Sequence, residues 1–167
     1  MARRALNSRK APAGTALGAG VRLLARRPHS RAELRQKLTR RGYDADAVES
    51  ALGRIAELGY LDDAAFARGL VRRRSTTRGP LALSAELSAR GIDRAGAADA
   101  LGEFPVEAQL EAATRLAERL YAGTTVPGYR EMLDRVGSKL LRRGFSAPVV
   151  RAACRAAFAG TSSSPEA

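Results

Sequence analysis

Residues 30–67 read SRAELRQKLTRRGYDADAVESALGRIAELGYLDDAAFA and carry the signals for two helices and the start of a third. Ser30 and Glu33 have the spacing of a capping box, in which the serine hydroxyl accepts from the Glu33 amide and the carboxylate reaches back to the Ser30 amide. Gly42 follows two arginines and suits the left-handed turn that ends a helix. The stretch therefore predicts a helix that begins after Ser30 and stops near Gly42.

The second half of this stretch predicts two further helices. One starts after Asp44, and its apolar stripe consists of Val48, Leu52 and Ile55. The other starts after Asp62, whose carboxylate is placed to cap it, while Asp63 lies at its positive end. Capping explains this acidic pair without a metal or acid–base role, because adjacent residues at a helix start point in different directions.

The pattern recurs along the chain. When the sequence is aligned on Gly42, Gly91 and Gly144, apolar residues recur eight and four positions before the glycine and one, six and ten positions after it. Such a shared register predicts three tandem three-helix repeats, stacked into an elongated, curved all-α array. The matching sets are Leu34, Leu83 and Val136; Leu38, Leu87 and Leu140; Tyr43, Ile92 and Phe145; Val48, Ala97 and Val150; and Leu52, Leu101 and Cys154.

The segments between these helices set the domain boundaries. We expect the first helix to begin near Thr15 and to continue through Arg27, where Pro28 ends it. In the third repeat, Gly123 is expected to end the first helix and Pro127 to open the next. The predicted organisation is a disordered basic arm (1–14), three repeats (15–59, 60–104 and 105–159) and a disordered tail (160–167).

The composition supports packed helices and a polyanionic or acidic partner. Of the 167 residues, 45% are apolar, only 5% are aromatic and none is tryptophan, so the core must consist mainly of Leu, Ala and Val. The formal charge is +12, which favours nucleic acid, an acidic protein surface or anionic lipid. A solvated positive surface without a polyanionic partner remains the alternative.

The sequence offers no constellation of reactive side chains. The single histidine, His29, stands in a loop and is expected to be exposed, and the single cysteine, Cys154, is expected to be a buried small hydrophobe. No cluster has metal-ligand spacing, so we expect no catalytic residues, no metal and no cofactor. No run is apolar enough to cross a membrane, and no leader pattern is present, so we expect a cytoplasmic protein. We also expect the protein to be a monomer.

Arginine clusters are the most informative chemical feature. Residues 21–41 hold eight basic residues opposed only by Glu33, and a second cluster spans residues 68–78. Guanidinium groups bind phosphate bidentately, although some of these arginines also suit the negative ends of helices. The candidate contacts with nucleic acid or a filament are Arg26, Arg27, Arg31, Arg35, Arg40, Arg41, Arg72, Arg73, Arg74, Arg78, Arg142 and Arg143.

These motifs together resemble those of the RecX regulatory proteins. The resemblance covers residues 21–158, and its most specific part is the Leu-Asp-Asp-x-x-Phe-Ala element at residues 61–67. The segment Leu140–Ser146 is similar to the third repeat of that family. The chain departs from the family at Leu81–Leu83, where basic residues are usual, which leaves Arg72–Arg74 and Arg78 as the better contacts in the second repeat.

The resemblance implies a non-enzymatic modulator of the RecA recombinase. Members of the family bind the RecA filament on single-stranded DNA, lie in its helical groove, and inhibit strand exchange, ATP hydrolysis and co-protease activity. A general DNA- or RNA-binding helical protein remains the alternative, and charge alone supports it. An enzyme ranks third, because no residue constellation favours one.

Overall fold

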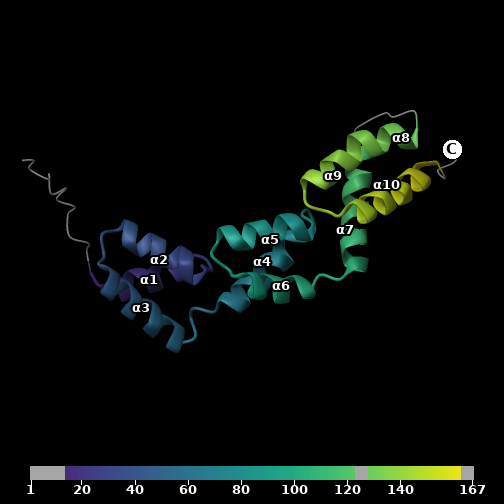
Figure 1. Ribbon diagram of the computed structural model, residues 1–167. Coiled ribbons are helices and arrows are strands. Elements are labelled where there is room, and N and C mark those ends of the chain that lie inside the picture. The colour runs from purple at the N-terminus through teal and green to yellow at the C-terminus, as the bar shows by residue number, and fades with distance from the viewer. Residues whose placement is uncertain (1–13, 123–127, 163–167) are drawn as a thin grey trace, which may run out of the picture. The chain divides into compact units, whose positions relative to one another are not determined.

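The computed structural model describes residues 14–122 and 128–162, and within these ranges every regular element is helical (Figure 1). This confirms the all-α fold predicted from the repeating pattern. The predictions for Gly123, Pro127, residues 1–13 and residues 163–167 lie outside the described residues. The helices are α1 Ala16–Leu24, α2 Arg31–Arg40, α3 Ala45–Glu57, α4 Asp63–Arg74, α5 Pro80–Ala89, α6 Arg94–Gly102, α7 Val106–Tyr121, α8 Tyr129–Met132, η1 Leu133–Gly137, α9 Ser138–Arg142 and α10 Ala147–Ser162.

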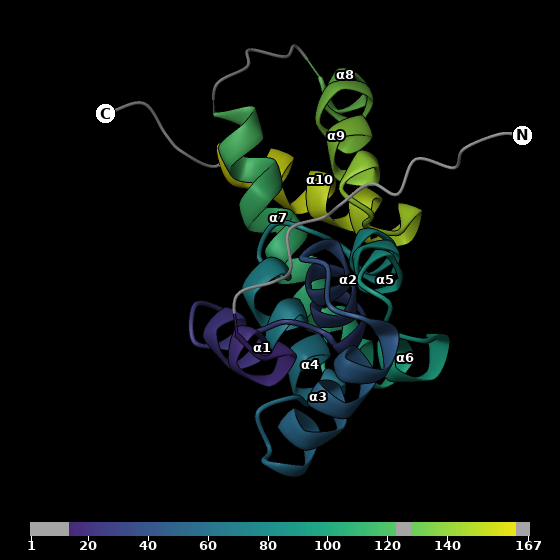
Figure 2. The ribbon, with the colours of Figure 1, turned by 90° about the vertical axis from the view of Figure 1, so that its left-hand side faces the viewer.

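The chain forms two compact units, Met1–Phe66 and Ala67–Ala167. In the first unit, α1, α2 and α3 pack against one another, as both views show (Figures 1 and 2). Their core includes Leu34, Leu38, Leu52 and Ile55, all fully buried. Burial of this apolar stripe supplies most of the stability of such short helices, because an isolated helix of about ten residues is marginal in water.

The repeating register found in the sequence corresponds to repeated local structure. Gly42, Gly91 and Gly144 have φ angles of 91°, 77° and 86°, which is the left-handed region expected for a glycine that ends a helix. The residues four and eight positions before each glycine are buried in all three repeats, with relative exposures of 0–1%. The sequence pattern therefore identifies the helix that each glycine ends and the face that it buries.

Four helices begin at a residue whose side chain caps them, as the sequence predicted for Ser30 and Asp62. Ser30, Asp44, Asp62 and Asp93 each accept a hydrogen bond from the backbone amide three residues later, at 3.1, 2.8, 2.9 and 2.7 Å respectively. Each bond satisfies an amide that has no partner within its helix. These caps fix where α2, α3, α4 and α6 begin.

The ends of the first and last helices differ from the sequence prediction. Helix α1 stops at Leu24 rather than continuing through Arg27, because the amides of Arg26 and Arg27 both donate to the Leu23 carbonyl in a closing turn. Helix α10 extends to Ser162, beyond the boundary at residue 160 that its small polar residues suggested. Both differences arise at helix termini, where local sequence signals are weakest.

The third repeat contains a π-helical turn that the sequence did not indicate. The predicted second helix of this repeat is divided into α8, the π turn η1 and α9. A Cβ atom on Gly137 in this turn would lie 3.2 Å from Val150 and 3.1 Å from Leu133, so the turn brings its backbone close to α10. A π turn adds one residue to the helical repeat and thereby changes which face the following residues present.

Helices α7 and α10 pack against each other in the second unit (Figure 2). The Phe158 ring makes edge-to-face contacts with Tyr121 and Tyr129, at centroid distances of 6.3 and 6.0 Å.

Cys154 is fully buried, as expected, and desolvation raises the pKa of its thiol. A buried thiol with a raised pKa is a structural side chain rather than a nucleophile. Among the described residues, no helix combines the length and apolar character that crossing a bilayer requires.

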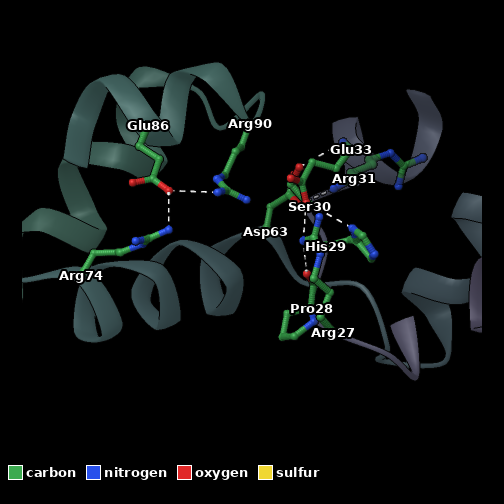
Figure 3. A network of polar contacts seen from close by, with 10 residues as sticks. All are labelled: Arg27, Pro28, His29, Ser30, Arg31, Glu33, Asp63, Arg74, Glu86 and Arg90. Carbon is green, nitrogen blue, oxygen red and sulfur yellow. Dashed lines mark hydrogen bonds and ion pairs between the residues drawn. The ribbon is translucent and has the colours of Figure 1, made fainter. Parts of the chain in front are cut away.

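His29 is buried, with 4% relative exposure, which corrects the expectation of an exposed loop residue. Its Nδ1 lies 3.2 Å from the Glu33 carboxylate, which also pairs with Arg27 at 3.2 Å (Figure 3). The burial follows from its position between the end of α1 and the start of α2, where two chain segments converge. Desolvation is the main cause that lowers the pKa of His29, the charge of Arg27 adds to it, and Glu33 opposes both.

We expect His29 to make the fold less stable in mild acid. A folded-state pKa below the ordinary 6.5 means that the unfolded chain takes up the proton first as the pH falls. Stability should therefore decrease as the pH falls through and below about 6.5. Urea unfolding at several pH values between 7 and 5 measures this, with His29→Gln as the control that cannot titrate. Parallel pH profiles for the two proteins would contradict the prediction.

Asp63 has a role beyond its own helix. Its Oδ1 accepts a hydrogen bond of 2.7 Å from the backbone amide of Arg31, the first residue of α2 (Figure 3). The carboxylate therefore lies at the positive ends of both α2 and α4. The sequence predicted only the second of these interactions, because the first joins residues that are 32 positions apart.

Candidate nucleic-acid interface

Three arginines surround a hollow in the first unit. Arg22 lies in the last turn of α1, Arg26 follows that helix, and Arg41 caps the C-terminal end of α2. Together with Leu23, they line a space of about 350 Å³. Within the described residues, none of the three guanidinium groups pairs with a carboxylate. We call this site the arginine hollow.

The arginine hollow has the chemistry of an anion site. Guanidinium groups present planar sets of N–H donors that match phosphate oxygens. An arginine that has no carboxylate partner can bind phosphate without first breaking an ion pair. The hollow lies near the C-terminal ends of two helices, where the partial negative charge favours cations. That charge helps to hold the arginines in place but does not neutralise them, so they remain available to phosphate.

Other arginines of the first unit are held by acids. Arg27 pairs with Glu33, whereas Arg31 and Arg35 both reach Glu49, at 3.5 and 3.0 Å. Hydrogen bonding from Arg35 is the main cause that lowers the pKa of the Glu49 carboxyl. These three candidate contacts have part of their charge offset within the protein. Arg40 is exposed and has no carboxylate partner in the part of the chain that the structure describes.

In the second unit, one arginine at the end of α4 lies close to a carboxylate, and two others have no carboxylate partner among the described residues. Arg74 lies 3.9 Å from Glu86, which also accepts a hydrogen bond of 2.9 Å from Arg90 (Figure 3). Arg72 and Arg73 are exposed and lack a carboxylate partner among the described residues. Arg74 is thus partly committed to the fold, whereas Arg72 and Arg73 are exposed and the Arg73 guanidinium lies over Gly69 of the same helix.

A backbone contact joins two arginine clusters that are distant in sequence. The Gly79 amide donates to the Arg143 carbonyl at 2.9 Å, and the Leu81 amide donates to the Gly144 carbonyl at 3.1 Å. The start of α5 therefore meets the end of α9. This contact places the backbone of Arg78 beside that of Arg142 and Arg143, which sequence reasoning had treated as separate clusters.

The same contact occupies the start of α5, where the sequence after Pro80 is apolar. The first amides of α5, which would otherwise be available to an anion, are used by the carbonyls at the end of α9. Leu81 stands at this junction and is 67% exposed. Because the helix start is occupied by backbone, a basic residue at Leu81–Leu83 is not required to complete an anion site there.

Sequence reasoning did not include Arg22 among the contacts. Its spacing of four residues from Arg26 was the available signal, because such residues lie on one face of a helix. Across residues 14–122 and 128–162, no group of three or more His, Cys, Asp or Glu side chains is placed to hold a metal ion. Arginine is thus the residue type that supplies the candidate ligand-binding groups of this interface.

Comparison with known proteins identifies the family. Residues 16–54 match the first three-helix domain of RecX, and residues 62–101 match the second. A regulatory protein RecX from Stenotrophomonas maltophilia (strain R551-3) is 39% identical over 86% of this chain and 85% of its own length. The chain belongs to the RecX family.

Other RecX proteins support the same assignment. The one from Halorhodospira halophila is 42% identical over 83% of this chain and 86% of its own length. The crystal structure of RecX from Lactobacillus salivarius superimposes with a TM-score of 0.75 at 26% identity, covering 86% of this chain and 95% of that one. A second RecX crystal structure gives a TM-score of 0.71 at 27% identity, over 80% and 68% of the two chains. The resemblance inferred from residues 61–67 and the helix-ending glycines is confirmed.

Proposed function

We propose that this RecX-family chain is a non-enzymatic regulator that binds the RecA filament on single-stranded DNA. It inhibits or modulates the recombinase, ATPase and co-protease activities of RecA in the cytoplasm, and so acts in homologous recombination, DNA repair and the SOS response. Membership of a family of regulatory proteins carries the proposal. The chain acts as a monomer and needs no cofactor.

The unpaired arginines supply the chemistry for the DNA part of this function. The arginine hollow, Arg40, Arg72 and Arg73 are cationic groups without an internal acid in the described residues, on a chain of net charge +12. Such groups bind a phosphate backbone without reading its sequence. This fits a regulator that must act wherever a filament forms.

The DNA-dependent ATPase rate of the cognate RecA tests the proposal. The protein is titrated from well below one molecule per RecA protomer, at physiological salt. We expect the rate to fall at substoichiometric ratios and to stay low when excess free single-stranded DNA is added. An effect that disappears on adding free DNA would show that the protein acts by sequestering nucleic acid.

General DNA or RNA binding is the second candidate, and the arginine hollow is the observation that favours it. Salt separates the two functions, since a protein that makes six to ten phosphate contacts loses roughly 10³- to 10⁵-fold in affinity between 50 and 200 mM salt. Under the proposed function, inhibition of RecA persists at salt concentrations that abolish binding to free DNA. Parallel loss of both activities would favour the second candidate.

A further inference from the structure

Helix α1 carries two apolar faces, and the core of the first unit uses only one of them. The inner face, with Ala16, Ala19 and Leu23, is buried at 2–7% relative exposure. The outer face carries Leu17 and Val21, which are 36% and 40% exposed. At these exposures, part of each of these two apolar side chains is accessible for contact with another molecule.

The outer face of α1 forms one wall of a groove. Val21, Leu24, Ala25 and Pro28 line it together with Tyr60, which follows α3, and its volume is about 420 Å³. Tyr60 is held in place by its backbone amide, which donates to the Ile55 carbonyl at 3.1 Å, yet the residue is 63% exposed. We call this site the Tyr60 groove. Its volume lies within the range of about 300–1,000 Å³ that is typical of ligand pockets.

The charge around the Tyr60 groove determines which occupant suits it. Arg22 and Arg26 lie on the same stretch of chain as the groove wall and are not neutralised by any carboxylate in the described residues. The first thirteen residues of the chain contain four basic residues and no acid, and a second copy also has a charge of +12. The positive charge around the groove would repel both the basic N-terminal segment and a second copy of this chain, whereas it would attract an acidic partner.

Nucleic acid matches this groove less well than protein does. Single-stranded bases bind to successive aromatic platforms, but Tyr60 is the only aromatic side chain in the groove lining, and its other walls are aliphatic. Tyrosine and arginine are instead enriched in protein–protein contacts, and here Tyr60 lies in the groove while Arg22 and Arg26 are neighbours in sequence of the groove residues Val21 and Ala25.

We propose that the Tyr60 groove binds an acidic segment of a partner protein through one or two of its apolar side chains. The acidic residues of that segment lie against Arg22 and Arg26, while the apolar side chain contacts Val21 and Tyr60. Taking RecA as that partner rests on the proposed function. The groove then gives the first unit an apolar contact with protein beside the arginine hollow, and the acidic residues of the partner share Arg22 and Arg26 with that hollow.

A peptide probe tests the groove without RecA. The probe is a nine-residue peptide of aspartate and glutamate with a central Phe-Leu pair, and its control carries Ser-Ser at that pair. We expect the probe, and not the control, to shift the backbone amide resonances of Val21, Ala25 and Tyr60 in the full-length protein. Val21→Ser combined with Tyr60→Ser should weaken probe binding by about tenfold. Equal binding of the two peptides would overturn the proposal.

Filament binding tests the same variant against RecA. The matched control is Leu81→Ser combined with Val106→Ser, which removes two exposed apolar side chains elsewhere on the chain. We expect only the Val21/Tyr60 variant to lose about tenfold in affinity for the RecA filament, with binding to free single-stranded DNA unchanged. An equal loss of affinity for free DNA would overturn the proposal, because Tyr60 would then contact a base.

The two experiments separate the inference from the proposed function. If the wild-type protein binds the acidic probe at the groove but does not bind the RecA filament, the proposed function is wrong. The inference that the groove binds an acidic protein segment is then retained, with a partner other than RecA. If the wild-type protein and the Val21/Tyr60 variant bind the filament equally well, the proposed function stands and the inference fails.

Discussion

Replacing Arg22, Arg26 and Arg41 together with glutamine is expected to reduce the affinity for single-stranded DNA by about tenfold or more at 100 mM salt. These residues line the arginine hollow, and their guanidinium groups have no carboxylate partner in the described part of the chain. Loss of three phosphate contacts should also lower the slope of log affinity against log salt by about two. Fluorescence anisotropy of a labelled oligonucleotide over a salt series measures both quantities.

The control variant removes the same number of positive charges by replacing three arginines that form ion pairs with carboxylates. Arg31, Arg35 and Arg54 are held by Glu49 and Glu57 in the same unit. Their replacement by glutamine changes the net charge equally but should leave the salt slope almost unchanged. If the two triple variants lose affinity and slope to the same extent, overall charge rather than the arginine hollow determines binding.

Gly144→Ala is expected to lower the free energy of unfolding of the second unit by about 2–5 kcal/mol. Gly144 has φ of +86°, and placing a side chain in this left-handed conformation costs about 1–2 kcal/mol. A Cβ atom there would also overlap the backbone of Ala82, and such overpacking typically costs about 1–3 kcal/mol more. Hydrogen exchange at the buried amides of α5 and α9 measures the loss in the affected unit.

Gly59→Ala is the matched control for this prediction. Gly59 has a similar φ of +75°, but a Cβ atom there would meet nothing within 4 Å. The free energy of unfolding of this variant should therefore fall only by the backbone cost of about 1–2 kcal/mol. Hydrogen exchange at the buried amides of α2 and α3 measures this change. Equal losses in the free energy of unfolding for the two variants would show that the overlap with Ala82 is relieved at no cost, which would contradict the prediction for Gly144.

The features that the sequence predicted depend on residues close together in the chain. The caps at Ser30 and Asp62 join a side chain to the amide three residues later, so the residue types and their spacing are sufficient. The glycine that ends a helix and the buried leucines before it are likewise local. These signals together were enough to establish the helical repeats and the family.

The features that the sequence did not predict depend on contacts between distant segments. Arg35 meets Glu49 because α2 packs on α3, and Arg22 shares a hollow with Arg41 because α1 lies beside α2. His29 is buried by the meeting of two helix ends rather than by any pattern of its own. A list of arginines could therefore be read from the sequence, but which of them are neutralised could not.

The repeats of this chain are not interchangeable modules. The second helix of the first repeat receives a carboxylate, that of Asp63, at its first residue, whereas the equivalent helix of the second repeat receives main-chain carbonyls from Arg143 and Gly144. The equivalent helix starts of these two repeats thus have different partners, a carboxylate in the first repeat and main-chain carbonyls in the second. Duplicating, deleting or reordering a repeat would therefore separate each helix from the segment whose oxygen atoms accept hydrogen bonds from its first amides.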